Sequence, residues 1–294
     1  MEHLVCLNTN SFPANTPAEG YTLFEEALQG LLQLNGGADR FTLYIDSNIE
    51  NFADFLIAES FTYQDFLTKL HEENEQDMLL FLTEIDDKTP ALDHLEEDVF
   101  NQLTEYTFYI PGHATAQFPD ILSLAFFTNA TMLSINTGEP WERSKIPVAR
   151  TSDGSFTVET LSVKNISSEQ HGIELFELLS NIDIIEICGK NLVTKDFHDW
   201  FNGLKDENKH RVADKMRLAV EREFKGGKPL FDTLNDAEGL REVRFSAHAG
   251  GAIRVLFKAL SDSKHAVLVG FIKKSDGEGY KYNIARANEL MESI

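Results

Sequence analysis

Three short β-patterned runs between Leu240 and Ser275 constrain the fold more than any other stretch of this chain. The runs are LREVRF, AIRVLFKAL and AVLVGFIKKS, and only a Gly-containing link and a polar turn separate them. Links this short join antiparallel strands, because parallel pairing needs a longer crossover. The stretch therefore predicts a three-stranded antiparallel meander.

Cations recur at similar places in the three runs. They are Arg241 and Arg244 in the first run, Arg254 and Lys258 in the second, and Lys273 and Lys274 at the end of the third. Successive side chains of a strand point to opposite faces, so Val243 and Phe245 are expected to face the core. Arg244 and Arg254 then lie together on the face turned away from the core. The meander is predicted to present a cationic surface.

The charge of the chain differs sharply between its two parts. Residues 1–180 hold 7 Lys and Arg against 30 Asp and Glu, whereas residues 181–294 hold 19 against 18. With 294 residues the chain is long enough for two cores. We expect an acidic, mixed α/β N-terminal domain over residues 1–185 and a second domain over residues 186–294. The asymmetry indicates either two domains with different partners or two domains that face each other, and a solvated acidic surface explains it equally well.

Cysteine content and hydropathy indicate a cytoplasmic protein. The chain has 2 cysteines, no CxxC motif and no apolar run long enough to span a bilayer. Its first residues lack the features of a signal peptide. We therefore expect no membrane partner, no metal site and no cofactor.

Periodicity predicts the remaining elements. Helices are expected over residues 20–34, 49–56, 62–71, 76–84, 91–105, 173–182, 195–204, 206–224 and 283–293. Further strands are expected over residues 41–45, 107–110, 131–135, 146–150, 155–163 and 184–188.

The motif YIDSN at residues 44–48 places Asp46 and Asn48 between a strand and the next element. A metal-dependent nuclease of the PIN class has such a residue pattern, but its hard cation needs several converging carboxylates. In so acidic a segment single carboxylates carry little information. We interpret Asp46 as a turn or N-cap residue.

Residues 194–290 resemble the RelE/HigB-like toxin family of bacterial toxin–antitoxin systems, particularly its phage-derived branch. The matching segments are FHDWFNGL (197–204), the long helix after it, GKPLFDTL (227–234), GLREVRF (239–245), IRVLF (253–257), GFIKKS (270–275), and Tyr280 with NIARA (283–287). The resemblance implies an α+β fold in which two helices pack on a small antiparallel sheet, with a C-terminal helix. Members of the family are typically mRNA endoribonucleases that act at the ribosome and are paired with an antitoxin, and a related branch poisons DNA gyrase.

The resemblance also implies roles for single residues. Arg254 corresponds to the arginine of the central strand, and we expect it to clamp the transition state, because a guanidinium holds two phosphate oxygens and stays charged. Arg244 is expected to orient the substrate, Lys273 and Lys274 to contact phosphate or the leaving group, and Tyr280 to stack on a base or move a proton.

Three further residues are expected to bind RNA, namely Arg241, Lys258 and His248. The chain departs from the family pattern in two ways. Glu242 stands where some relatives carry a cation, and no histidine follows His265, so no general base is assigned. The structural alternative makes Arg244 and Arg254 solvated or Glu242-paired strand cations, the lysines a solvated strand end and Tyr280 a packing residue.

Two functions remain open from the sequence. In one, the chain is a toxin-type ribonuclease whose acidic N-terminal domain restrains the basic face by intramolecular contact. In the other, it is a binding or sensing protein of stress or phage response whose toxin fold has lost catalysis. Gyrase poisoning is a third, less supported alternative.

Overall fold

A computed structural model describes residues 2–36, 39–95, 97–114, 116–152, 156–235, 237–247, 250–261, 263–273 and 279–294. The chain is a mixed α/β protein. It divides into two compact units, Met1–Leu178 and Leu179–Ile294, called here the N-terminal and the C-terminal unit. None of the described helices is both long and apolar enough to cross a bilayer. The expected domain limits, 1–185 and 186–294, stay a prediction.

A mixed sheet forms the centre of the N-terminal unit, in the strand order β5-β2-β1-β7-β9-β8-β6. Its parallel strands are β1 (Glu2–Leu7), β2 (Arg40–Tyr44), β5 (Asp86–Lys88), β7 (Thr131–Leu133) and β9 (Phe156–Ile166). Two antiparallel strands follow, β8 (Lys145–Ser152) and β6 (Thr107–Tyr109). Buried β1 is apolar at Val5, Cys6 and Leu7, as expected of a central strand covered on both faces.

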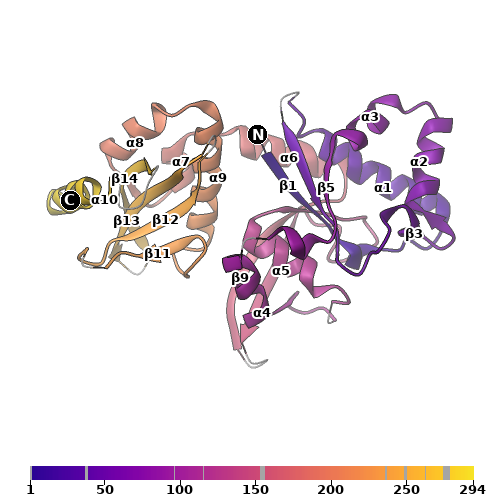
Figure 1. The fold of residues 1–294 in the computed structure, drawn as a ribbon, viewed down its shortest axis with the longest axis horizontal. Helices are drawn as coiled ribbons and strands as arrows, with labels where there is room; N and C mark the ends of the chain where they lie inside the picture. The colour runs from indigo at the N-terminus through magenta and orange to yellow at the C-terminus, as the bar shows by residue number, and fades with distance from the viewer. Residues whose placement is uncertain are drawn as a thin grey trace. The chain divides into compact units, whose positions relative to one another are not determined.

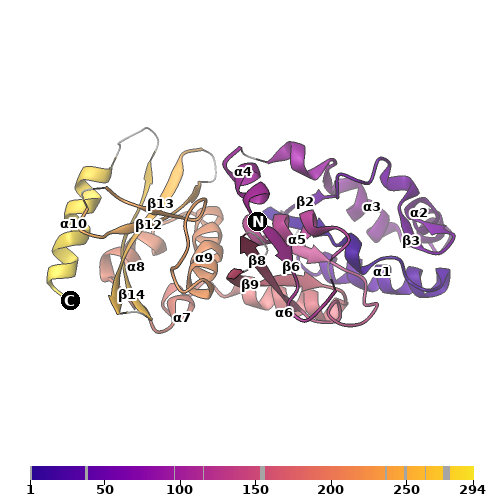
Figure 2. The ribbon, with the colours of Figure 1, turned by 90° about the horizontal axis from the view of Figure 1, so that it is seen from below.

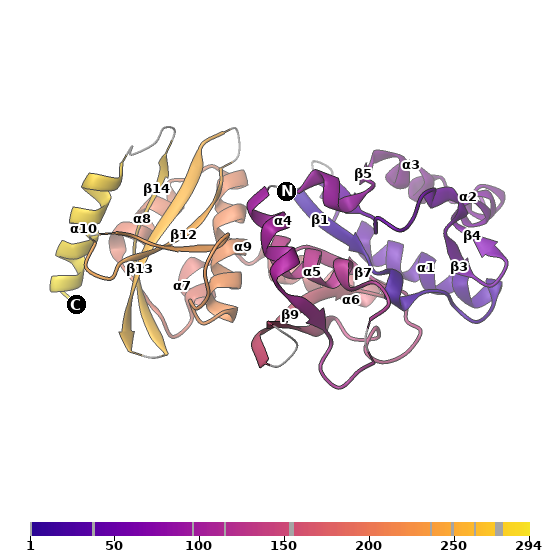
Figure 3. The ribbon, with the colours of Figure 1, turned by 60° about the horizontal axis from the view of Figure 1, so that its bottom comes forward.

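The helices of this unit are α1 (Pro17–Leu32), α2 (Tyr63–Glu72), α3 (Gln76–Glu84), α4 (Glu97–Glu105), α5 (Pro119–Thr128) and α6 (Glu169–Ser180). A small hairpin joins β3 (Leu56–Ala58) to β4 (Phe61–Thr62), and single 3-10 turns cover Thr9–Ser11, Phe52–Asp54 and Ala91–His94. Within the unit, α2, α3 and the hairpin lie at the end opposite to β9 (Figure 3).

The prediction of a helix over residues 49–56 is wrong. The segment makes one 3-10 turn and then enters β3. The Asn51 side chain caps only this turn, by accepting a hydrogen bond from the amide of Ala53. Phe52, the first residue of the turn, stacks on Tyr63 at 4.1 Å between ring centroids, so it packs without a full helix.

The C-terminal unit is built on the predicted meander, which is confirmed. Its sheet has the order β10-β14-β13-β12-β11. The antiparallel strands are β11 (Phe231–Thr233), β12 (Arg241–Ser246), β13 (Ala252–Ser261) and β14 (Lys264–Lys273), and β10 (Leu192–Val193) pairs parallel to β14.

Helices cover both faces of this sheet. They are α7 (Ile184–Cys188), α8 (Lys195–Asn202), α9 (Asp206–Glu221) and α10 (Tyr280–Glu292). Figures 1 and 2 show α9 and α10 on opposite sides of the sheet. One core therefore forms on the α8 and α9 side around Phe224, Phe231 and Phe257. A second core forms under α10 around Leu256 and Ala287.

Residues 184–188 form helix α7, so the strand expected there is wrong. The Asp183 carboxylate accepts hydrogen bonds from the amides of Ile185 at 2.9 Å and Glu186 at 3.2 Å. This N-cap satisfies amides that a helix otherwise leaves free, and it outweighs the β preference of the isoleucines.

Helix α8 lies very close to the sheet at a single glycine. A Cβ built on Gly270 would lie 2.2 Å from two ring carbons of Trp200. Trp200 thus packs directly on the backbone of β14, and only glycine leaves room for the ring.

Candidate functional site

The candidate site lies on the face of the C-terminal sheet that α10 covers. Arg244 and Arg254 are directly paired in the register of β12 and β13, and Phe271 of β14 flanks Arg254 on its other side. The shared face expected for the two arginines is confirmed. Tyr280, the first residue of α10, reaches this face through a ring contact with Phe271.

The prediction that this face is turned away from the core is wrong, because the face is covered. The side chains of Arg254 and Glu242 are 6 % and 3 % exposed. The cause is α10, which packs on β13 and β14 and buries a second apolar cluster around Leu256. Arg254 is therefore a buried charge.

Arg254 is held in a closed network with Glu242 and Tyr280. The guanidinium Nε lies 3.2 Å from Oε1 of Glu242 and donates a 3.0 Å hydrogen bond to the Tyr280 hydroxyl. That hydroxyl donates in turn to Oε2 of Glu242 at 2.7 Å. Nη1 of Arg254 donates to the carbonyl of Ile253 at 2.8 Å. Each buried charge thus has partners, which a buried ion pair requires to be tolerated.

The environment shifts the proton affinities of this network. Burial raises the pKa of Glu242, although the hydrogen bond from Tyr280 and the charge of Arg254 act in the opposite direction. Burial and the hydrogen bond to Glu242 raise the pKa of Tyr280. Glu242 is consequently a better proton acceptor than an ordinary carboxylate, and the Tyr280 phenol keeps its proton at neutral pH.

A more accessible group of charges borders the network. The Arg244 side chain is 31 % exposed, and its Nη1 donates to Oδ2 of Asp232 at 2.8 Å. Lys228 reaches the same carboxylate at 4.0 Å. Lys273 Nζ lies 5.6 Å from the ring centre of Tyr280. Of these side chains, Lys273 brings its positive charge beside the phenol ring, whereas Arg244 and Lys228 share the carboxylate of Asp232.

The other expected residues are not brought to this site within the described part of the chain. Arg241 lies on the opposite face, where Nη1 donates to the carbonyl of Phe224 at 2.8 Å and the guanidinium lies 5.4 Å from the Phe231 ring centre. Lys258 is four residues beyond Arg254 on β13, a rise of about 13 Å along a strand. Lys274 and His248 lie outside the described residues.

Sequence reasoning did not assign a site role to Glu242 or to Asp232. For Glu242 it noted only that some relatives carry a cation at this position, and that a strand arginine could form an ion pair with it. Its position two residues before Arg244 puts it on the Arg254 face by simple alternation. That signal, with the known preference of buried charges for pairing, could have marked Glu242 as a site residue.

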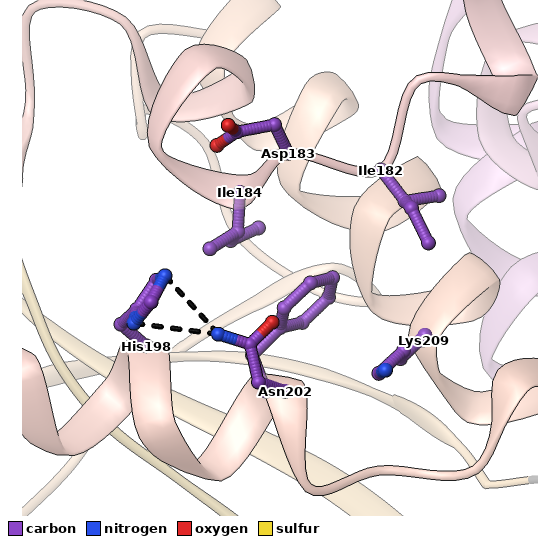
Figure 4. A pocket seen from close by; sticks show the side chains of 7 residues that line it. Ile182, Asp183, Ile184, His198, Asn202 and Lys209 are labelled. Carbon is purple, nitrogen blue, oxygen red and sulfur yellow. Dashed lines mark hydrogen bonds between the residues drawn. The ribbon is translucent and has the colours of Figure 1, made fainter.

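An open pocket of about 230 Å³ lies on the other side of the sheet, among α7, α8 and α9 (Figure 4). His198 and Asn202 line it and are hydrogen bonded, with the amide nitrogen 3.1 Å from Nε2 of the ring. Figure 4 shows Lys209 and Asp183 at its rim. None of the expected site residues lines this pocket, so it is separate from the Arg254 network.

Comparison with known proteins finds one family model that matches part of the C-terminal unit. Residues 199–292 match the model of the family described as Phage derived protein Gp49-like (DUF891). The C-terminal third matches a RelE/HigB-like toxin family. The resemblance expected from the sequence is confirmed, and the Gp49-like segment contains every residue of the Arg254 network. No curated protein matches the chain.

Proposed function

We propose that the Gp49-like segment is a toxin of the toxin–antitoxin type that cleaves mRNA without a metal ion. The family match supports the toxin class. The observation that carries the ribonuclease proposal is the coupling of Arg254, Tyr280 and Glu242 beside the half-exposed Arg244. This set combines positive charge for a phosphate with a path for a proton.

The proposed reaction is an attack of the ribose 2′-oxygen on the adjacent phosphorus. The 2′-hydroxyl proton passes to the Tyr280 oxygen while the phenol's own proton moves to Glu242. The bond from phosphorus to the 5′-oxygen breaks, the 5′-oxygen takes a proton from water, and the products are a 2′,3′-cyclic phosphate and a 5′-hydroxyl. The raised pKa of Glu242 suits it to accept this proton.

The two arginines have different roles in this proposal. Arg244 is accessible and contacts the phosphate, where its guanidinium stabilises the charge that grows on the phosphorane oxygens. Arg254 is a positioning residue, since it holds the Tyr280 oxygen at 3.0 Å and balances the charge of Glu242. Lys273 adds positive charge beside the phenol. As in the family, an antitoxin and the ribosome are the proposed partners.

The test uses the full-length chain with Arg244→Ala, Tyr280→Phe and Arg286→Ala. Arg286 is the matched control, because it is also an ion-paired arginine of this unit, bound to Asp196 at 2.7 Å, but belongs to α10 outside the network. Induced expression of the natural chain should arrest growth, and primer extension should map new mRNA ends. We expect Arg244→Ala and Tyr280→Phe to abolish both effects and Arg286→Ala to retain them. Cleavage that persists in both site variants contradicts the proposal.

A binding or sensing protein is the second candidate, and one observation favours it. Arg254 and Glu242 are buried and paired with each other, as in a purely structural ion pair. This function predicts that the natural chain cleaves no mRNA and that Arg244→Ala leaves both phenotype and partner binding unchanged. Chromosome breaks with intact mRNA would indicate the gyrase-poisoning alternative instead.

A further inference from the structure

Buried polar side chains gather where the parallel strands of the N-terminal unit end. Strands β1, β2, β7 and β9 end at Leu7, Tyr44, Leu133 and Ile166. The side chains at this edge are Asn8, Thr9, Ser11, Asp46, Ser134, Asn165 and Ser167, each at most 2 % exposed. The carboxyl edge of a parallel sheet is also where α/β proteins bind their ligands.

Some of these polar side chains form hydrogen bonds with one another. The Asn8 amide donates to the Ser134 hydroxyl at 2.8 Å, and that hydroxyl donates to Oδ1 of Asn165 at 2.6 Å. Asn165 then donates to the carbonyl of Arg143 at 2.8 Å. These residues link β1, β7 and β9 and have the partners that buried polar groups require.

Asp46 differs from its neighbours. Asp46 follows β2. In the parallel pairing of β1 with β2, Cys6 lies beside Tyr44, and the same register continued by two residues places Asp46 beside Asn8. Its Oδ1 accepts hydrogen bonds from the backbone amide and the side-chain amide of Asn48, at 2.9 and 2.8 Å. Its Oδ2 is buried without a hydrogen-bond partner among the described residues, as is the Thr9 hydroxyl on the turn after β1. A buried carboxylate without a partner is costly unless something neutralises it.

A second carboxylate, that of Asp120, belongs to a helix that packs on β1. Asp120 is the second residue of this helix, α5. The residue before this helix is fixed to the end of β1, because Asn10 donates to the Phe118 carbonyl at 2.9 Å and accepts from its amide at 2.8 Å. Burial and, after it, the negative charge of Asp46 raise the pKa of Asp120. Among the described residues, no ion pair involves Asp46 or Asp120.

We propose that this edge of the sheet binds a hard divalent cation of the Mg²⁺ type between Asp46 and Asp120, with the Thr9 hydroxyl as a neutral oxygen beside it. Carboxylate and hydroxyl oxygens are ligands of this cation class. Among the described residues no three His, Cys, Asp or Glu side chains converge on one point. Two carboxylates are nevertheless what proteins commonly supply to Mg²⁺, which fills its other positions with water or phosphate oxygens.

Isothermal titration of the chelator-treated full-length chain with MgCl₂ and with MnCl₂ tests the site. The natural chain should bind one ion, Asp46→Asn should lose binding, and Asp120→Asn should bind more weakly. Asp77→Asn is the matched control, because Asp77 is an exposed carboxylate at the second position of α3, as Asp120 is in α5. Its binding should equal that of the natural chain. Absent binding, or an equal loss in the control, overturns the proposal.

A stability measurement separates a cation site from a structural aspartate. Asparagine at position 46 retains an acceptor for Asn48 and removes the negative charge. In EDTA, Asp46→Asn should melt no lower than the natural chain, since the repulsion with Asp120 is gone. Mg²⁺ should raise the melting temperature of the natural chain only, because a ligand stabilises the state that binds it. If Asp46→Asn does not fold, Asp120→Asn decides the question by the same comparison, and an unshifted natural chain refutes the site.

Discussion

Arg244 and Arg254 lie directly opposite each other on β12 and β13, yet each guanidinium has a carboxylate of its own. Like charges at opposed positions of a strand pair destabilise a sheet. Here Asp232 pairs with Arg244 at the accessible end, and Glu242 pairs with Arg254 under α10. The two arginines therefore differ in what their removal does to the protein.

Truncation of Arg254 should lower the free energy of unfolding much more than truncation of Arg244. Arg254→Ala leaves Glu242 buried without its cation, and such a loss costs about 3–5 kcal/mol. Arg244→Ala removes a half-exposed pair, which is worth about 0–1 kcal/mol. Urea unfolding followed by circular dichroism measures both free energies of unfolding. Equal losses would show that the Arg254 pair is no more buried than the Arg244 pair.

The Tyr280 hydroxyl is expected to stabilise the docking of α10. Tyr280→Phe keeps the ring contact with Phe271 but leaves Arg254 and Glu242 each without one hydrogen-bond partner. An unpaired buried polar group costs about 1–3 kcal/mol. Hydrogen exchange of the α10 amides should accelerate, whereas Tyr282→Phe, at a residue that is 74 % exposed, should leave exchange unchanged. Unaltered exchange in Tyr280→Phe would mean that the hydroxyl does not hold the helix.

The raised pKa of Glu242 predicts a pH dependence with a definite sign. A carboxyl whose pKa is higher in the folded state than its ordinary value of 4.5 stabilises the fold most below pH 4.5. That contribution is lost as the pH rises through the folded value. Relative to the natural chain, Glu242→Gln should therefore become less destabilising as the pH rises from 4.5 towards neutrality. Melting temperatures of both proteins across this range give the comparison, and a difference that grows with pH would reverse the sign.

Gly270 should not tolerate a larger residue. In Gly270→Ala the new Cβ would meet Trp200 at 2.2 Å, and overpacking of this kind costs about 1–3 kcal/mol. Gly227→Ala is the matched control, because a Cβ added at Gly227 would have no neighbour within 4 Å. Thermal unfolding should show a lower melting temperature for the first variant alone. A normal melting temperature would require α8 to shift on the sheet at no cost.

The sequence predicted those parts of the C-terminal unit that local patterning determines. Alternating residues from Arg241 to Lys273 specified the strands and put Arg244 and Arg254 on one face. The pairing of Arg254 with Glu242 depends on the cross-strand register, in which Glu242 opposes Leu256 and is a diagonal neighbour of Arg254. The burial of that pair depends on α10, which begins only at Tyr280. Neither fact is encoded in the residues around Arg254 alone.

Local signals also misled at two places. The isoleucines of residues 184–188 favour a strand, but the Asp183 cap decides for a helix. The periodic apolar residues of 49–56 favour a helix, but the segment makes one 3-10 turn, in which Phe52 stacks on Tyr63, and then enters β3. In both cases one side-chain contact outweighed intrinsic propensity, which is a weak determinant of structure.

The short strand β10 has a consequence for how the Gp49-like segment should be handled. Leu192 and Val193 pair with β14, and the Thr194 amide donates to the carbonyl of Val267 at 3.0 Å. All three residues precede position 199, where the family match begins. A fragment trimmed to the family limits would expose the hydrogen-bonding groups of β14 as a bare sheet edge, which invites intermolecular pairing. Recombinant fragments of the toxin-like part should therefore start at Leu179, the first residue of its compact unit.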